Sequence, residues 1–298
     1  MTTQVSARAT KHRTFSFGRV SAIASNTILE LIRLKVFYIL VLFALAVIAS
    51  SLFQAKITFQ DQFQILKDVS LGAMSIFTWL LATLSTAMLL PKDIEDRTLY
   101  TILAKPVPRF EYLLGKLLGV MVMLLLAIVL MSAMMVVVLY LRETVVAADE
   151  VAQTPPEFRA QRLAEVRASA FNPNLIPGVL VVYIKAVVIA TVTLLISTFS
   201  SSWIFTIFIS TAVTLIGHLQ ATAREVWMDQ QVHGFFTGLF TAAIAILFPD
   251  LQVFSLVDDI AVGTAVPLIL FVKAFGLGTT YIVMYFVVAY FSFASREL

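Results

Sequence analysis

Long apolar runs separated by shorter polar segments dominate this chain. Six of the runs lie at residues 36–53, 69–90, 117–141, 175–197, 203–219 and 267–293. Each is close to the roughly 20 apolar residues that an α-helix needs to cross a bilayer. Four of them, including the second and the third, contain no Asp, Glu, Lys or Arg. We therefore expect an all-α, polytopic integral membrane protein with six transmembrane helices.

A seventh apolar run, at 234–248, has only 15 residues, which is short for a span. The segment around it, 220–265, is acidic, and residues 224–259 contain five acidic side chains and one basic one. Because Lys and Arg favour cytoplasmic loops, this composition indicates the outside of the membrane. We expect a re-entrant segment there before the last span. A full crossing would make seven spans and place the C-terminus outside.

Composition supports the same fold class. Hydrophobic residues make up 60% of the 298 positions, charged residues only 13%, and the mean hydropathy is +0.94, whereas soluble globular proteins contain about 25% charged residues. The absence of cysteine excludes disulfides and cysteine-based zinc sites. The net charge of +3 gathers near the N-terminus and in segment 91–116. That distribution is typical of a topology signal, and we expect no nucleic-acid partner.

Residues 1–35 are predicted to form a cytoplasmic tail and an amphipathic helix at the membrane interface. They hold six basic groups against one acidic group, Glu30, which favours the inside of the cell. Residues 36–298 then form one transmembrane domain, with both termini cytoplasmic. Over 16–35, mostly apolar residues recur on one side of a helix, and these are Val20, Ile23, Thr27, Leu31 and Leu34.

Segment 91–116 is a charged island between two of the apolar runs, with five basic and four acidic residues. Its basic residues indicate a cytoplasmic loop. Acidic residues from Asp93 to Asp96 suit the positive start of a short helix, and Pro106 and Pro108 would end it. The pattern fits either a short amphipathic helix that a partner can contact or a plain charged connector.

Four short motifs in this island resemble the signature loop of type-2 ATP-binding-cassette (ABC) permeases. They are Glu-Asp-Arg-Thr-Leu at 95–99, Leu-Ala-Lys-Pro-Val-Pro-Arg at 103–109, Glu-Tyr at 111–112 and Leu-Gly-Lys at 114–116. The branch that the chain resembles contains the permease of the nitrous-oxide-reductase maturation transporter. The segment Pro249–Phe254 and the ending Phe-Ala-Ser-Arg-Glu at 293–297 are similar to family patterns too.

The resemblance implies that residues 93–104 form a coupling helix that docks on a separate ATPase subunit. It implies an exporter in a bacterial inner (plasma) membrane, built from a permease homodimer or a pair of related permeases with two ATPase subunits. ATP and Mg²⁺ would bind to the ATPase, since this chain has no Gly-x-x-x-x-Gly-Lys-Ser/Thr loop. We therefore expect no cofactor and no enzyme activity in this chain itself. The predicted coupling residues are Asp93, Glu95, Asp96, Arg97, Thr98, Leu99, Lys105, Pro106, Arg109, Glu111, Gly115 and Lys116.

Segment 142–171 is the long hydrophilic stretch between spans and is predicted to lie outside. It carries four arginines and five carboxylates, with Pro155-Pro156 in the middle and a predicted helix at 157–168. It could hold an external partner or form a solvated flap. The partner alternative defines a second function, in which the ABC complex transmits force to that partner without moving a solute.

Lys185 lies within the fourth apolar run. An ionisable residue inside a span is a candidate for a substrate pathway, and the alternative is that Lys185 snorkels or pairs with another helix. A stand-alone carrier or channel is a further alternative, although such carriers show internal repeats that this chain lacks. Glu225, Asp229 and His233 have a spacing that can hold a metal, but a solvated helix face is the commoner explanation, and we assign no metal site.

Overall fold

The computed structural model describes residues 15–57, 62–95, 107–229, 248–256, 260 and 266–295. Six helices in this part are long and apolar enough to cross a membrane. This confirms the predicted all-α fold and indicates a multi-pass membrane protein. The six are α2 (Lys35–Ile57), α3 (Gln62–Glu95), α5 (Arg109–Gln153), α7 (Leu175–Phe199), α8 (Trp203–Asp229) and α11 (Leu268–Ser295).

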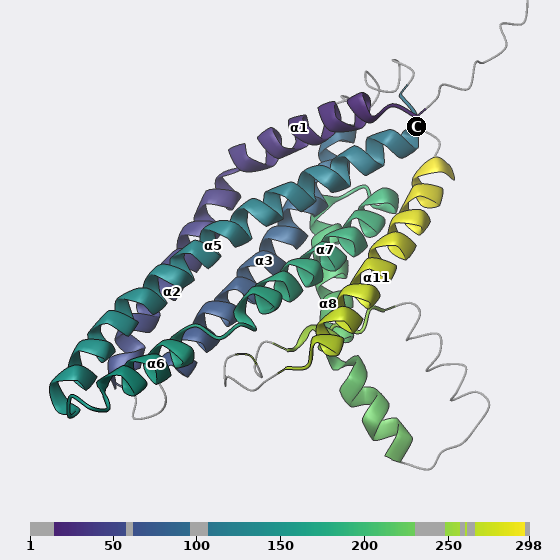
Figure 1. Ribbon diagram of the computed structural model, residues 1–298. Helices are drawn as coiled ribbons and strands as arrows, with labels where there is room; N and C mark the ends of the chain where they lie inside the picture. Colours follow the sequence, from purple (N-terminus) through teal and green to yellow (C-terminus); the bar gives the residue numbers. More distant parts are fainter. Residues whose placement is uncertain are drawn as a thin grey trace, which may run out of the picture.

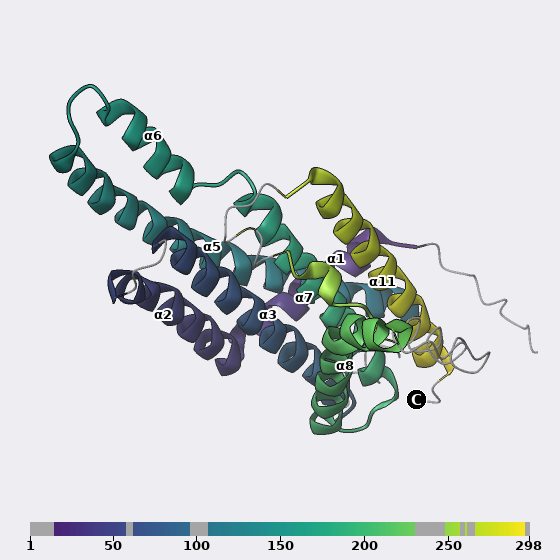
Figure 2. The same cartoon turned by 90° about the horizontal axis from the view of Figure 1, so that it is seen from below.

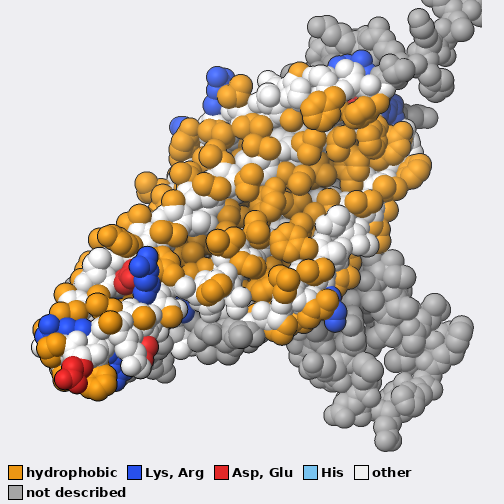
Figure 3. Space-filling model, in the orientation of Figure 1, with side chains coloured by type: hydrophobic (Ala, Val, Ile, Leu, Met, Phe, Trp, Pro, Cys, Tyr) orange, Lys and Arg blue, Asp and Glu red, His pale blue; other side chains and the backbone are white. Residues whose placement is uncertain are grey.

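Helix α7 lies at the centre of the bundle and is the most buried of the six (Figures 1 and 2). It contacts α3, α5, α8 and α11, while α2 packs on the other side of α3 and α5. The core between them is mainly apolar, with buried Ser and Thr side chains among the apolar ones. Hydrophobic side chains cover the middle of the molecular surface, and charged ones gather towards its two ends (Figure 3). That surface is the one expected of a protein surrounded by lipid.

Helix α1 (Phe17–Arg33) confirms the amphipathic helix predicted near the N-terminus. It runs beside the first half of α5 (Figure 1). Val20, Thr27 and Leu31 on its inner face are buried, whereas Phe17 and Leu29 are exposed. The apolar face of α1, which was expected to contact the membrane surface, is therefore largely covered by α5.

Helix α3 is longer at both ends than the predicted span at 69–90. It starts at Gln62, so α2 and α3 account for all of the polar segment between the first two apolar runs, 54–68, except 58–61. Gln62–Lys67 contains neither Gly nor Pro, and the Lys67 ammonium donates to the Ser169 carbonyl at 3.2 Å. The helix therefore extends beyond the apolar run, because Gln62–Lys67 favours helix and Lys67 is held by its contact with Ser169.

The other end of α3 passes through Pro91 to Glu95. A new helix starting at Asp93 is therefore contradicted, because Asp93 and Glu95 belong to the last turn of α3. Proline removes a single backbone donor, and membrane helices tolerate that loss. Asp93 is held by side chains of α5, described below, which keeps this last turn in place. The rest of the predicted coupling helix, 96–104, lies outside the described residues.

Helix α5 continues twelve residues beyond the predicted end at 141 and pairs with α6 (Arg159–Ala170) as a helical hairpin (Figures 1 and 2). The helix predicted at 157–168 is confirmed, while the start of this loop is helical too. Residues 142–153 contain no Gly or Pro, so their helix propensity extends α5 as far as the Pro155-Pro156 turn. The Arg142 guanidinium donates to the Gln62 side-chain carbonyl at 2.9 Å and ties the hairpin base to α3.

A short buried turn precedes the last helix. It contains the 3₁₀-helix η1 (Gln252–Phe254), and the Leu251 amide donates to the Gly217 carbonyl of α8 at 3.1 Å. Phe254 is buried against Gly278 of α11. The predicted re-entrant run 234–248 lies outside the described residues except for its last one.

Candidate functional site

Charged side chains from three helices, α1, α3 and α5, meet where α3 ends and α5 begins, on both sides of segment 96–106. This site, which we call the charged junction, lies at the upper right of Figure 1, where the ends of α1, α5 and α11 come together. Its members are Arg19 and Glu30 of α1, Lys92 and Asp93 of α3, and Arg109, Glu111, Tyr112 and Lys116 of α5.

Lys116 is the most buried cation of the junction, with 4% of its side chain exposed. Its ammonium lies 2.7 Å from the Asp93 carboxylate and 3.4 Å from that of Glu30. It also lies 5.8 Å from the centre of the Tyr112 ring. A buried charge is tolerated only when it is paired, so these contacts hold Lys116 between α3, α1 and its own helix.

Asp93 is the buried carboxylate that pairs with Lys116. Besides its ion pair with Lys116, its carboxylate accepts a hydrogen bond from the Tyr112 hydroxyl. Both partners come from the first two turns of α5. The last turn of α3 is therefore fixed to the first turns of α5, although the chain between the two helices runs through segment 96–106.

Glu30 connects this pair of helix ends to α1. Its two carboxylate oxygens lie 3.3 Å from the Lys92 ammonium and 3.4 Å from the Lys116 ammonium. The pair with Lys92 is partly exposed and contributes little stability by itself. The bridge matters for geometry, because one carboxylate links cations of α3 and α5.

Glu111 and Arg19 form a two-pronged ion pair at the start of both helices. Arg19 donates from Nε at 2.5 Å and from Nη2 at 2.7 Å, and the Ser16 amide donates to the same carboxylate at 2.9 Å. Only 1% of the Glu111 side chain is exposed. Such bidentate contacts fix orientation as well as distance. The Glu111 carboxylate raises the pKa of Arg19 above its usual value, so the guanidinium stays charged.

Two glycines allow α1 to approach α5 closely. A Cβ atom added at Gly115 would lie 2.7 Å from Cβ of Ile23, and one added at Gly119 would lie 2.6 Å from Cβ of Thr27. Gly115 and Gly119 are one helical turn apart, the spacing that brings helix backbones together in membranes. Along α1, the residues that contact α5 are Arg19, Ile23 and Thr27. Their partners along α5 occur in the same order, as Glu111, Gly115 and Gly119, so the two helices run parallel.

Arg109 and Tyr112 attach the end of α11 to the same site. The Arg109 guanidinium donates to the Phe293 carbonyl at 3.2 Å and also to the Ala294 carbonyl. A cation at the last carbonyls of a helix satisfies groups that have no partner within the helix. The Tyr112 ring stacks on Phe293 with 5.8 Å between ring centres. One helix start therefore contacts α1, α3 and α11 together.

The predicted coupling residues separate into three groups. The structure brings Asp93, Arg109, Glu111, Gly115 and Lys116 together at the junction. The helix α3 includes Glu95 as its last residue, but nothing is described of its side chain. The remaining members, Asp96, Arg97, Thr98, Leu99, Lys105 and Pro106, lie outside the described residues.

Sequence reasoning missed the contribution of α1 and the aromatic member of the site. Arg19 and Glu30 were assigned only to a topology signal, and Tyr112 only to a motif. Two signals pointed to them. Glu30 is the single acidic residue among the first 35, and Gly115 and Gly119 have the spacing of a close helix contact.

Lys185 lies half-buried in α7, close enough to His218 of α8 for the two side chains to interact electrostatically. His218 Nδ1 is 2.8 Å from the Thr214 carbonyl. Four buried hydroxyls of α3, α7 and α8 have no hydrogen-bond partner among the described residues. They belong to Thr83 and Thr86 of α3, Ser197 of α7 and Ser210 of α8. Such groups are rare in protein interiors, and here they mark the contact region of α3, α7 and α8.

No metal-binding group of three or more His, Asp or Glu side chains occurs in the described part of the chain. The side chains of the spaced set Glu225, Asp229 and His233 lie outside it. In the comparisons with known proteins, no family model and no curated protein matches the chain.

Proposed function

We propose that this chain is the membrane-spanning permease subunit of an ATP-driven ABC exporter, with a separate ATPase docking on segment 95–106. One observation carries the proposal. Both flanks of that segment end in a single charged junction that also holds α1 and α11. A loop with no mechanical role would not need buried ion pairs, which are costly to assemble.

The junction would convert a displacement of segment 96–106 into movement of several helices. Asp93, Lys116 and Tyr112 lock the end of α3 to the start of α5, so these two helices would move together. Glu111 extends the connection to α1, and Arg109 extends it to α11. ATP binding can drive such a movement only if the ATPase contacts differ between the two states of the permease.

The predicted coupling residues then take two roles. Glu95, Asp96, Arg97, Thr98, Leu99, Lys105 and Pro106 would contact the ATPase. Asp93, Glu111 and Lys116 are buried and paired within the chain, so they would position that surface. Gly115 would let α1 follow α5 at close distance.

The proposal places the junction and both termini in the cytoplasm of a bacterial cell and the α5–α6 hairpin outside its inner membrane. A transported solute would pass the buried hydroxyls of α3, α7 and α8. Lys185 would be a charged group at another point of the pathway, about 18 Å from Ser197 along α7. Two permeases, identical or related, would pair with two ATPase subunits, which bind ATP and Mg²⁺.

The test is purification of the tagged chain from its native host in mild detergent, followed by mass spectrometry. We expect a stoichiometric ATPase with a Walker motif. Glu95→Lys combined with Arg97→Glu should lose the ATPase, because both charges of the docking surface are reversed. The matched control is Arg162→Glu combined with Glu165→Lys, which reverses an exposed ion pair of α6. Retention of the ATPase by the first double variant would contradict the coupling assignment.

A second candidate function is force transmission to an external partner. It is favoured by α5 itself, which runs for 45 residues without interruption from the junction to the hairpin. At 1.5 Å per residue, this helix is about 68 Å long. A single helix of that length would carry a displacement at the junction directly to α6. Deletion of 142–171 should then abolish function, whereas a solute exporter should keep its efflux.

A further inference from the structure

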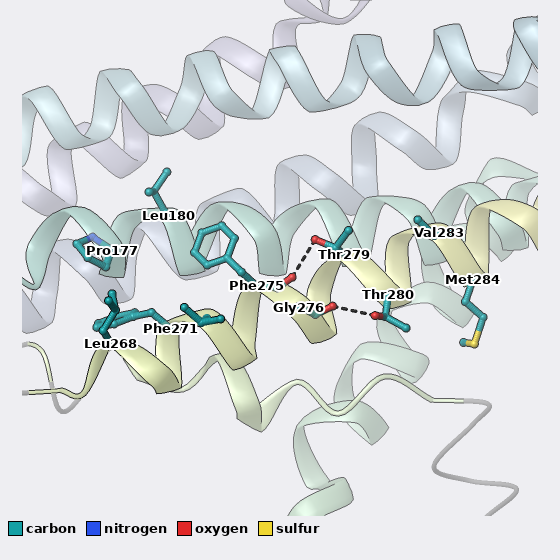
Figure 4. A pocket seen from close by; sticks show the side chains of 11 residues that line it. Pro177, Leu180, Leu268, Phe271, Phe275, Gly276, Thr279, Thr280, Val283 and Met284 are labelled. Atoms are coloured by element: carbon teal, nitrogen blue, oxygen red, sulfur yellow. Dashed lines mark hydrogen bonds between the residues drawn. The ribbon is translucent and has the colours of Figure 1, made fainter.

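An apolar groove of about 890 Å³ lies between α7 and α11 (Figure 4). The hydroxyls of Thr279 and Thr280 both donate to carbonyls of their own helix, at 2.8 and 2.9 Å, so they offer little polarity to a ligand. Its walls are otherwise apolar, and the main contributors are Pro177, Leu180, Phe271, Phe275, Val283 and Met284.

The groove faces outward from two helices that are long and apolar enough to span a membrane. Its floor is open at Gly276, where an added Cβ atom would meet nothing within 4 Å. From Leu268 to Met284 the groove follows α11 for about 24 Å, at 1.5 Å per residue. That length is comparable with the hydrocarbon core of a bilayer, about 30 Å.

Lys273 supplies a charge beside this groove. It is exposed and directly follows Val272, which lines the groove. It lies five residues from the start of α11, or about 8 Å along the helix. Within the described residues Lys273 has no ion pair. A lysine near the end of a span extends its ammonium towards the lipid head groups, where phosphate is the available anion.

We propose that the α7–α11 groove binds an anionic phospholipid, with an acyl chain along the groove and the phosphate beside Lys273. A second copy of the chain fits less well. A symmetric contact through α11 would bring two Lys273 side chains together in a medium of low dielectric constant. A phospholipid with a net negative charge satisfies both the apolar groove and the cation. The inference is independent of the proposed transport function.

Native mass spectrometry of the detergent-purified chain, mixed with equal amounts of phosphatidylglycerol and phosphatidylcholine, tests this site. We expect about fivefold preferential retention of phosphatidylglycerol, since one basic residue near a charged lipid surface contributes about that factor. Lys273→Gln should remove the preference, and Lys273→Arg should keep it. Gly276→Leu should reduce retention of both lipids, because its side chain enters the groove from a position where an added Cβ atom meets nothing within 4 Å.

Val288→Leu is the matched control, since it enlarges an exposed position of α11 outside the groove. Equal retention of the two lipids by the unaltered chain, or full retention by Gly276→Leu, would overturn the proposal. The chain has no cysteine, so Thr280→Cys tests the second-copy alternative in membranes. Disulfide-linked dimers would show that a neighbouring chain occupies the groove and would also overturn it, whereas monomers agree with a lipid.

Discussion

The ammonium of Lys116 lies 2.7 Å from the carboxylate of Asp93, although the two residues stand on opposite sides of segment 96–106. The ion pair closes a loop whose two ends are helices of the bundle. Whatever contacts the loop therefore acts on α3 and α5 at one point.

Replacement of Lys116 by Met should destabilise the protein, because Asp93 would remain buried without its cation. Removal of one partner of a buried pair costs about 3 kcal/mol, which corresponds to a fall of about 6 °C in Tm at about 2 °C per kcal/mol. Combining Lys116→Met with Asp93→Asn should recover much of the loss, since no charge is then left unpaired. Thermal unfolding in detergent measures both. Additive losses in the double variant would argue against the pair.

Gly115→Ala should push α1 away from α5, because the new methyl group would lie within 2.7 Å of Cβ of Ile23. Overpacking of this kind costs about 1–3 kcal/mol, and we expect a lower Tm. The control is Gly72→Ala on α3, where an added Cβ atom meets nothing within 4 Å. If the two variants unfold at the same temperature, the close contact of α1 with α5 is not important for stability.

Arg109→Gln should loosen the end of α11, since its guanidinium no longer bonds the Phe293 and Ala294 carbonyls. Loss of a hydrogen bond to a charged group costs about 1.5 kcal/mol, which corresponds to about tenfold faster amide exchange in the last turn of α11. Hydrogen-exchange mass spectrometry of 288–295 is the measurement. Arg159→Gln, on exposed α6, should leave this region unchanged, and equal protection in both variants would contradict the capping role.

Val145→Pro distinguishes the two proposed functions. Val145 is exposed in α5 beyond the apolar run 117–141, and proline in a helix interior costs about 3 kcal/mol and kinks the helix. A solute exporter should retain its efflux, whereas force transmission through α5 should fail. Activity assays of this variant beside Val145→Ala provide the comparison. Equal loss in both variants would show that the side chain, and not helix continuity, matters.

The spans were predictable from the sequence because hydropathy alone defines them. For α7 the expected limits, 175–197, differ from the observed ones by two residues at one end. The limits of α3 and α5 were less predictable, because both helices extend into polar segments. There the helix depends on propensity and on contacts such as Arg142 with Gln62, which hydropathy does not register.

The charged junction was only half predictable. Glu111 and Lys116 were identified from local motifs and Asp93 from its place at the predicted start of a helix, but both signals suggested a surface for a partner. Their partners within the chain come from residues distant in sequence, as with Glu111 and Arg19, which are 92 positions apart. No periodicity in one segment reports such a pairing, and only the packed helices reveal it.

The parallel pairing of α1 with α5 also sets an order of events during synthesis. Gly115 and Gly119 are synthesised 92 residues after Ile23 and Thr27, the residues of α1 that they contact. At a synthesis rate of about 5–20 residues per second, α1 exists for roughly 5–18 s before the facing part of α5 has been made. During that interval its apolar face needs another cover, and the lipid surface next to the nascent chain can provide one. The apolar face of α1 would thus contact lipid during synthesis and α5 in the folded protein.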